Sequence, residues 1–171
     1  MKGPRARKRL GKATGFQIRQ ASLRDLDALV EQRHKMFEDL RHRTPTEHHI
    51  GDQAYREFVP EMIRKKRFVG FLAVTKDGLP VAGACLWLKE VQPHPGKTRP
   101  RKTPYLMSVY TLPEFRGRGL ATRLVKETMK WSRKRGFTQM TLHASKMGRR
   151  LYKALGWERT WEMRLNLKNP R

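Results

Sequence analysis

The sequence predicts one α/β domain, a mixed sheet flanked by helices, and three observations lead to this fold class. The 171 residues suffice for a single domain with its own hydrophobic core. Runs with the periodicity of strands and helices follow one another in the order β, α, α, β, β, β, α, β, α, β. The helices late in the chain connect consecutive strands, which makes the strands they join parallel. We therefore expect about six strands and four helices in residues 16–171, after a basic tail over residues 1–15.

A strand and two helices are expected in the first third of the domain. Residues 16–21 alternate apolar and polar side chains, as half-buried strands do. Ser22 can cap a helix that starts at Leu23, with Asp25 and Asp27 in its first turn. The apolar side chains of this helix fall on one stripe: Leu26, Leu29, Val30, Met36, Phe37 and Leu40. Residues 41–52 are expected to end it, and residues 53–66 to form a shorter helix interrupted by Pro60.

The middle of the chain is rich in strand-forming residues. Residues 67–75 and 79–90 read as two strands of a hairpin, joined by the turn Lys76-Asp77-Gly78. Residues 91–104 contain four prolines and few apolar side chains, which predicts a long loop. Residues 105–111 then form a further strand.

A glycine-containing loop and a helix begin the last third. The helix starts at Leu120 and is predicted to bury Leu120, Leu124, Val125, Thr128 and Trp131, with Arg123, Lys126, Glu127 and Lys130 outside. Residues 137–144 read as a strand, residues 145–155 as a short helix before Gly156, and residues 157–167 as a final strand.

The net charge is far from that of an ordinary soluble domain. Lys and Arg number 39 against 15 Asp and Glu, a formal net charge of +24. A phosphorylated cofactor needs only a few of these groups, so we expect a polyanion such as a nucleic acid or a ribosome to meet the basic surface and tail. A proteome that is basic in general is the alternative explanation.

Composition also excludes several classes of protein. The single cysteine, Cys85, lies in an apolar run, which predicts burial in a strand and leaves no internal disulfide. His48 and His49 are adjacent but have no further ligand at a fixed spacing, so no metal site is expected. No apolar run has the length of a membrane span and no signal segment follows the N-terminus, so we expect a cytoplasmic protein without membrane contact. The expected oligomeric state is a monomer or a homodimer.

The loop Arg116-Gly117-Arg118-Gly119 stands directly before the helix from Leu120. Amides in the first turn of a helix lack intrahelical partners, and glycines leave room beside them, so a phosphate or pyrophosphate is expected there. A P-loop would need Lys and Ser or Thr after the second glycine, and a dinucleotide fingerprint would need a third glycine. Both are excluded by the residues present.

These residues carry a resemblance to the GCN5-related N-acetyltransferase (GNAT) superfamily. The family's pyrophosphate signature, Gln/Arg-x-x-Gly-x-Gly/Ala, is matched from Arg116 to Ala121. A second family element is matched by SKMGRRLYKALGW, with Ser145, Gly148, Leu151, Tyr152, Gly156 and Trp157 at the family's spacings. The resemblance covers about residues 16–167 and implies the GNAT fold, in which the two central parallel strands splay apart.

The resemblance implies a binding site for acetyl-CoA as co-substrate. The pyrophosphate is expected on the amides of Arg116, Gly117, Arg118, Gly119, Leu120 and Ala121, and the pantetheine on the backbone of Ser108, Val109, Tyr110 and Thr111, with Ser145, Arg149 and Tyr152 completing the site. The acceptor pocket is expected from residues 33–37, residues 41–58 and the loop around His94.

Transfer to an amine needs an acid for the leaving thiolate, a donor to the thioester oxygen and a route for the amine proton. Tyr152 stands at the family's general-acid position, and the Val109 N–H at the position of the donor. For the base, Glu90 and His143 are candidates, and a water chain without a single base is the third alternative. We thus expect an N-acetyltransferase that acts on a primary amine in a ternary complex. The rival is a nucleic-acid- or ribosome-associated protein on the same scaffold, either binding only or acetylating an amine linked to RNA or the ribosome.

Overall fold

The structure, a computed structural model, describes residues 15–40, 44–92, 95, 101–163 and 165. The elements are, in chain order, β1 (Gln17–Gln20), the 3-10 turn η1 (Leu23–Asp25), α1 (Leu26–Leu40), α2 (Pro45–Arg64), β2 (Phe68–Val74), β3 (Pro80–Val91), β4 (Arg101–Thr111), the 3-10 turn η2 (Pro113–Phe115), α3 (Leu120–Lys134), β5 (Thr141–Leu142) and α4 (Arg149–Ala154). The predicted α/β class is confirmed. In the part of the chain that is described, no helix combines the length and the apolar character needed to cross a membrane.

The strands form one mixed sheet in the order β1-β2-β3-β4-β5. The first four pair antiparallel, and β4 pairs with β5 in parallel. This parallel pair is short, joining only Tyr105 to Thr141 and Leu106 to Leu142, whereas β4 continues to Thr111. The two strands therefore part after Leu106 and Leu142, as the expected splay requires.

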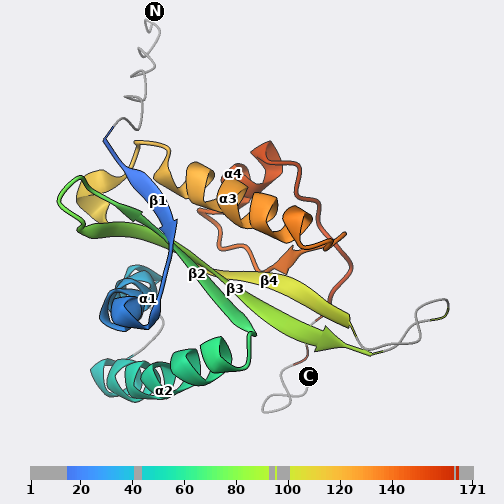
Figure 1. Ribbon diagram of the computed structural model, residues 1–171, viewed down its shortest axis with the longest axis horizontal. Helices are drawn as coiled ribbons and strands as arrows, with labels where there is room; N and C mark the ends of the chain where they lie inside the picture. The colour runs from blue at the N-terminus through green and yellow to red at the C-terminus, as the bar shows by residue number, and fades with distance from the viewer. Residues whose placement is uncertain (1–14, 41–43, 93–94, 96–100, 164, 166–171) are drawn as a thin grey trace, which may run out of the picture.

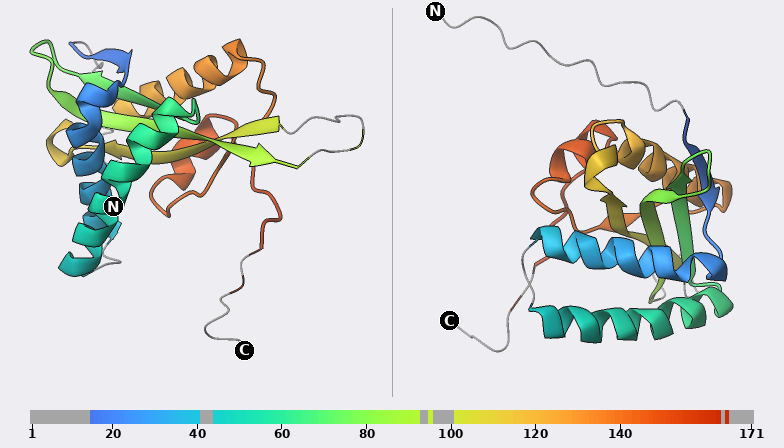
Figure 2. Two further views of the ribbon diagram at one scale, coloured as in Figure 1. Left: turned by 60° about the horizontal axis from the view of Figure 1, so that its bottom comes forward. Right: turned by 90° about the vertical axis from the view of Figure 1, so that its left-hand side faces the viewer.

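Helices cover both faces of the sheet, as Figure 1 and both views of Figure 2 show. On one face, α1 and α2 bury Leu29, Val30, Tyr55 and Val59 against the sheet in a core that includes Leu72 and Cys85. On the other face, α3 buries Leu120, Leu124 and Val125 against a second core. Thr128 is buried as predicted, and Arg123 and Glu127 are half-buried rather than fully outside. The predicted burial of Cys85 is confirmed.

Helix α2 begins earlier than the sequence suggested. Residues 45–52, expected to break the chain, are helical, because Thr44 and Glu47 form a capping box: the Glu47 N–H donates to Thr44 Oγ1 at 3.3 Å, and the Thr44 N–H donates to Glu47 Oε2 at 2.8 Å. Pro45 occupies the first helical turn, where a missing N–H costs nothing. The expected interruption at Pro60 is also wrong, since α2 continues through it to Arg64. The buried side chains of Tyr55 and Val59 hold this part of the helix on the core.

Strands β3 and β4 extend into the predicted loop at residues 91–104. β3 runs to Val91, and β4 begins at Arg101, so Pro104 lies inside a strand, opposite Leu88. The Leu88 N–H donates to the Arg67 carbonyl on the β2 side, so the Leu88 and Pro104 backbones exchange no hydrogen bond. The proline nitrogen faces away from β3, toward the side of β5, but β5 pairs with β4 only from Tyr105 onward, so the missing N–H costs the ladder nothing.

The C-terminal part of the chain contains less strand than predicted. Of residues 137–144 only Thr141–Leu142 pair as a strand. The strand expected at residues 157–167 is absent over its described residues, 157–163 and 165. An alternating pattern makes a strand only where the backbone finds a partner, and here Trp161 is 99% exposed. The sheet thus has five strands where about six were expected.

Candidate functional site

The glycine loop ends in an uncapped helix. Gly117 and Gly119 have φ of 76° and 77°, the left-handed region that favours glycine, and no side chain caps α3. The first α3 hydrogen bond that reaches back to the loop runs from the Arg123 N–H to the Gly119 carbonyl, at 3.1 Å. The first turn carries no acidic residue, and a Cβ placed on Gly119 would meet nothing within 4 Å. Unpaired amides and open space therefore coincide where the sequence predicted a pyrophosphate.

The two arginines of the loop are engaged by the protein itself. Arg116 donates from Nε to the Thr111 carbonyl at 2.9 Å and forms an ion pair with Asp39 of α1. Arg118 lies over the rings of Phe16 and Phe115, at 5.9 and 5.3 Å from their centroids. Arg116 thus ties the loop to β4 and α1, whereas Arg118 is exposed and, with the amides from Gly117 onward, can donate to an anion.

A bulge interrupts β4 beside the gap between β4 and β5. Gly83 pairs with Tyr110 and Cys85 with Met107, so β4 has one residue more than β3 over this stretch. Ser108 adopts a left-handed conformation with φ of 52°, which is uncommon for a residue with a side chain. The bulge thus falls on the predicted pantetheine strand, next to Val109.

Tyr152 lies on α4, packed against the core beneath α3, and its ring contacts that of Trp157. The turn before α4 is closed by Ser145, whose Oγ accepts the Gly148 N–H at 3.2 Å and whose carbonyl accepts the Arg149 N–H at 3.2 Å. Burial, together with the charge of Tyr105 when ionised, raises the pKa of Tyr152. Ser145 and Tyr152 therefore belong to one local unit, with a phenol that stays protonated.

His143 is held at both ring nitrogens. Nδ1 lies 2.6 Å from the Tyr105 hydroxyl and Nε2 lies 2.8 Å from Glu162 Oε1. Because a carboxylate only accepts, Nε2 carries the hydrogen, and Nδ1 of the neutral ring accepts from the Tyr105 hydroxyl. Tyr105 belongs to the first of the two residue pairs that join β4 and β5, and His143 directly follows the last paired residue of β5.

Glu90 lies at a different place on the sheet. It is ion-paired with Arg67 and stands opposite Lys102, three positions along β4 from Tyr105. At the rise of a strand this separation is roughly 10 Å. The structure brings His143 and Tyr105 together and leaves Glu90 outside the group.

Sequence reasoning did not find Tyr105 or Glu162. Both are brought to His143 by the fold, from β4 and from the segment after α4, and no local spacing signals such a meeting. His94 and residues 41–43 of the predicted acceptor pocket lie outside the described residues. His48 contacts the ring of His34, and within the described ranges no group of three or more His, Cys, Asp or Glu could hold a metal ion.

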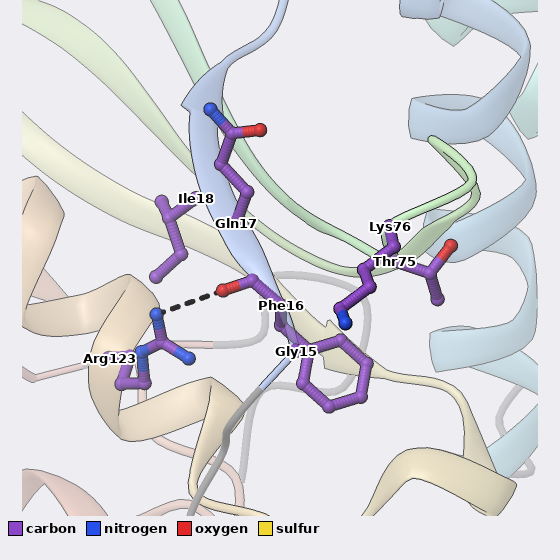
Figure 3. Close-up of a pocket in the computed structure, with 7 residues that line it drawn as sticks. All are labelled: Gly15, Phe16, Gln17, Ile18, Thr75, Lys76 and Arg123. Atoms are coloured by element: carbon purple, nitrogen blue, oxygen red, sulfur yellow. Dashed lines mark hydrogen bonds between the residues drawn. The ribbon is translucent and has the colours of Figure 1, made fainter.

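A hollow on the described surface lies elsewhere, at the β1 edge of the sheet. Figure 3 shows it between β1, the turn after β2 and the first turns of α3, where Arg123 donates to the Phe16 carbonyl at 3.2 Å. It contains neither the bulge nor Tyr152. We place the candidate site by the chemistry of the loop, the bulge and α4 instead.

Comparison with known proteins identifies the family. The sequence model of the Acetyltransferase (GNAT) family matches residues 27–157. An uncharacterized N-acetyltransferase of Methanocaldococcus jannaschii is 24% identical over 149 residues, 84% of this chain. The chain spans 61% of that relative's length.

Two solved structures resemble the whole domain. A GCN5-related N-acetyltransferase from Ralstonia eutropha JMP134 superposes with a TM-score of 0.79 at 26% identity, over 91% of this chain and 100% of the other. A predicted acetyltransferase from Clostridium acetobutylicum, solved with acetyl-CoA, gives the same TM-score at 24% identity, over 90% and 97%. The second likeness shows the fold alone.

Proposed function

Because the chain belongs to the acetyltransferase (GNAT) family, a family that uses acetyl-CoA, we propose that it transfers an acetyl group from acetyl-CoA directly to a primary amine in a ternary complex. One observation carries the proposal. Beyond Leu106, β4 runs unpaired with β5 through its bulge toward the uncapped loop before α3, and Tyr152 of α4 packs on the core that contains Leu106 and Leu142.

Main-chain groups would hold acetyl-CoA. The amides of residues 117–121 bind the pyrophosphate, since no side chain competes for the first turn of α3. The Arg116 N–H, also expected there, already donates to the Pro113 carbonyl at 3.2 Å. The backbone of residues 108–111, on the side that β5 leaves open, pairs with the pantetheine amides as it would with another strand. Ser145 and Arg149, at the start of α4, complete the site.

Acetyl-CoA supplies an activated acyl group as a thioester, and the chain supplies a donor and an acid. The Val109 N–H, beside the bulge, donates to the thioester carbonyl oxygen. Tyr152 holds the proton that the departing sulfur takes, and its raised pKa keeps that proton on the phenol at neutral pH.

His143 takes the proton of the amine in this proposal. The Tyr105 hydroxyl takes the proton of the amine and passes its own proton to Nδ1 of His143, which carries no hydrogen in the neutral ring. Glu162 at Nε2 stabilises the imidazolium that results. Glu90 is the weaker candidate because Arg67 already neutralises its carboxylate. A water chain to solvent remains the alternative route.

No acyl-enzyme is proposed. Cys85 is buried, and burial raises the pKa of its thiol to about 12, so the thiolate that attacks a thioester is not formed at neutral pH. Direct transfer is the remaining route.

The proposal is tested by thiol release from acetyl-CoA in the presence of small amines, peptides and charged tRNA. We expect release that depends on an amine and yields its N-acetyl derivative by mass spectrometry. Absence of amine-dependent release across these pools would contradict the transferase function. The rival, a nucleic-acid- or ribosome-bound role, rests on the charge of +24 and gains nothing from the relatives described above.

A further inference from the structure

The positively charged guanidinium of Arg33 lies on the face of α1 that packs against the core. It follows Leu29 and Val30 and precedes Phe37 at the spacing of one helical stripe, and its side chain is only 24% exposed. The guanidinium lies over two aromatic rings, 4.8 Å from the centroid of Phe37 and 4.6 Å from that of Tyr55. Desolvation lowers the pKa of Arg33, which means that its charge is held there at a cost.

Few of the N–H groups of this guanidinium find a hydrogen-bond acceptor in the described part of the protein. Nη1 donates to the Gly51 carbonyl at 3.3 Å, and Asp52 Oδ1 lies 3.8 Å away, beyond hydrogen-bond distance. The other oxygen of Asp52 lies 2.5 Å from His34 Nδ1, so Asp52 serves mainly His34. In the described part of the chain the other N–H groups of Arg33 have no hydrogen-bond acceptor.

The Tyr55 hydroxyl, beside Arg33, is a second unsatisfied group. Tyr55 is 6% exposed, and its hydroxyl is buried with no hydrogen-bond partner among the described residues. The side chains of Cys85 and of Ser108, a residue of the bulge, lie close to the Tyr55 hydroxyl, but neither meets the geometry of a hydrogen bond with it. Buried hydroxyl groups are nearly always paired, so an orphan at this place points to a ligand.

We infer that the acceptor amine also carries a carboxylate, which Arg33 and Tyr55 bind next to the bulge of β4. This inference rests on the proposed function and specifies its substrate class. The in-plane N–H groups of a guanidinium stacked on aromatic rings match a carboxylate in two parallel hydrogen bonds. Asp52 nearby disfavours a doubly charged phosphate. Arg33 lies over the ring of Tyr55 and Ser108 lies near its hydroxyl, so we expect a short spacer between the carboxylate and the amine, as in an amino acid.

The wild-type protein provides the first test. Amino acids and their primary amides are compared as acceptors at equal concentration, with thiol release as the readout. The amide has more free amine at neutral pH, so chemistry alone favours it. We expect kcat/KM to be roughly 10- to 100-fold higher for the amino acid, the size of hydrogen bonds to a charged group.

Variants locate the preference. Arg33→Met keeps the unbranched stem of the side chain without the guanidinium and is expected to remove the preference, mainly by raising KM for the amino acid. Arg33→Lys keeps the charge without the fork and is expected to restore part of it. Arg64→Met is the matched control, because Arg64 is an exposed arginine at the end of α2, outside the expected acceptor pocket, whose Nε donates to the Pro60 carbonyl of the same helix at 3.4 Å. It should leave both kcat/KM values unchanged, and calorimetry should give the same acetyl-CoA affinity in all four proteins.

Each other outcome has a defined meaning. Equal or faster acetylation of amides or of phosphoethanolamine would overturn the inference and leave the transferase function standing. If Arg33→Met still acetylates amino acids faster than their amides, Arg33 is not the residue that binds the carboxylate. Acetyl-CoA binding without acetylation of any amine would contradict the proposed function as well. If Arg33→Met does not fold, the inference is tested by the kcat/KM values of the wild type and of Arg33→Lys for amino acids and their amides.

Discussion

Gly148 and Tyr152 fit against each other so closely that no side chain can stand at position 148 without displacing the tyrosine ring. A Cβ on Gly148 would lie 2.8 Å from Cε2 of Tyr152. The backbone of Gly148, with φ of −75° and ψ of −22°, suits any residue, so the requirement for glycine comes from the ring alone. Gly148 therefore leaves the space that the Tyr152 ring occupies.

Gly148→Ala is predicted to lower kcat about 10-fold while changing acetyl-CoA affinity little, because it moves the acid and not the loop before α3. Steady-state kinetics and calorimetry measure the two quantities. A double-mutant cycle with Tyr152→Phe provides the control. If alanine acts through the ring, adding it to Tyr152→Phe causes no further loss; additive losses would show an effect on the fold instead.

Tyr152→Phe is predicted to lower kcat about 100-fold, within the range for proton transfer from a placed side chain. Binding of acetyl-CoA should change far less, because the hydroxyl acts on a thiolate that exists only late in the reaction. Equal kcat in wild type and variant would assign Tyr152 to packing against Trp157.

Gly119→Glu is predicted to abolish acetyl-CoA binding, since it puts a negative side chain beside the first-turn amides of α3. Gly136→Glu is the matched control: Gly136 follows the other end of the same helix, with φ of 78° against 77° and equally open space. Both substitutions carry the same backbone strain, so thermal unfolding should shift alike while calorimetry separates them. Loss of binding in both would point to the helix as a whole.

The acid sensitivity of folding is predicted to depend on Asp25. Its carboxylate accepts both Nη groups of Arg19, at 2.6 and 2.9 Å, and the Ser22 N–H at 2.8 Å, which hold its pKa far below 3.8. This stabilisation is complete above the unfolded pKa and is lost as the pH falls below it. Arg19 is 38% exposed and partly screened, so we expect Asp25→Asn to cost about 1 kcal/mol at pH 7.

Urea denaturation at pH 7, 5 and 3 measures this effect. The wild type should lose more stability between pH 5 and 3 than Asp25→Asn does. Asp27→Asn is the control, because Asp27 is 86% exposed. Parallel pH profiles for wild type and Asp25→Asn would place the acid sensitivity in other carboxylates.

The basic surplus is predicted to bind nucleic acid without strong sequence preference, with log affinity falling linearly in log salt. Six of the charges stand in residues 1–15, and +18 remains without them, so deletion of this tail should make the salt slope shallower without abolishing binding. Acetylation of a small amine should stay nearly unchanged. Filter binding at several salt concentrations decides: absence of binding near physiological salt leaves the charge as background composition.

The sequence by itself determined the elements and residues whose signals are local. The glycine loop, the helix from Leu120 and the central strands were predicted from motif and periodicity, because caps, turns and amphipathic faces involve residues a few positions apart. The role of Tyr152 was predicted from the family resemblance. A local signal was also present where the prediction failed at α2: Thr44 and Glu47 form a capping box that the proline and histidines around it obscured.

Only the tertiary structure decided which distant side chains meet. Three separate segments bring Tyr105, His143 and Glu162 together. Arg33 of α1 contacts Tyr55 of the neighbouring helix α2. Likewise, residues 157–163 have the alternation of a strand but no strand pairing, because alternation sets which side chains share a face and not whether a neighbouring backbone is available. Contacts of this kind depend on how whole elements pack, and packing is a property of the folded chain that no single stretch of residues encodes.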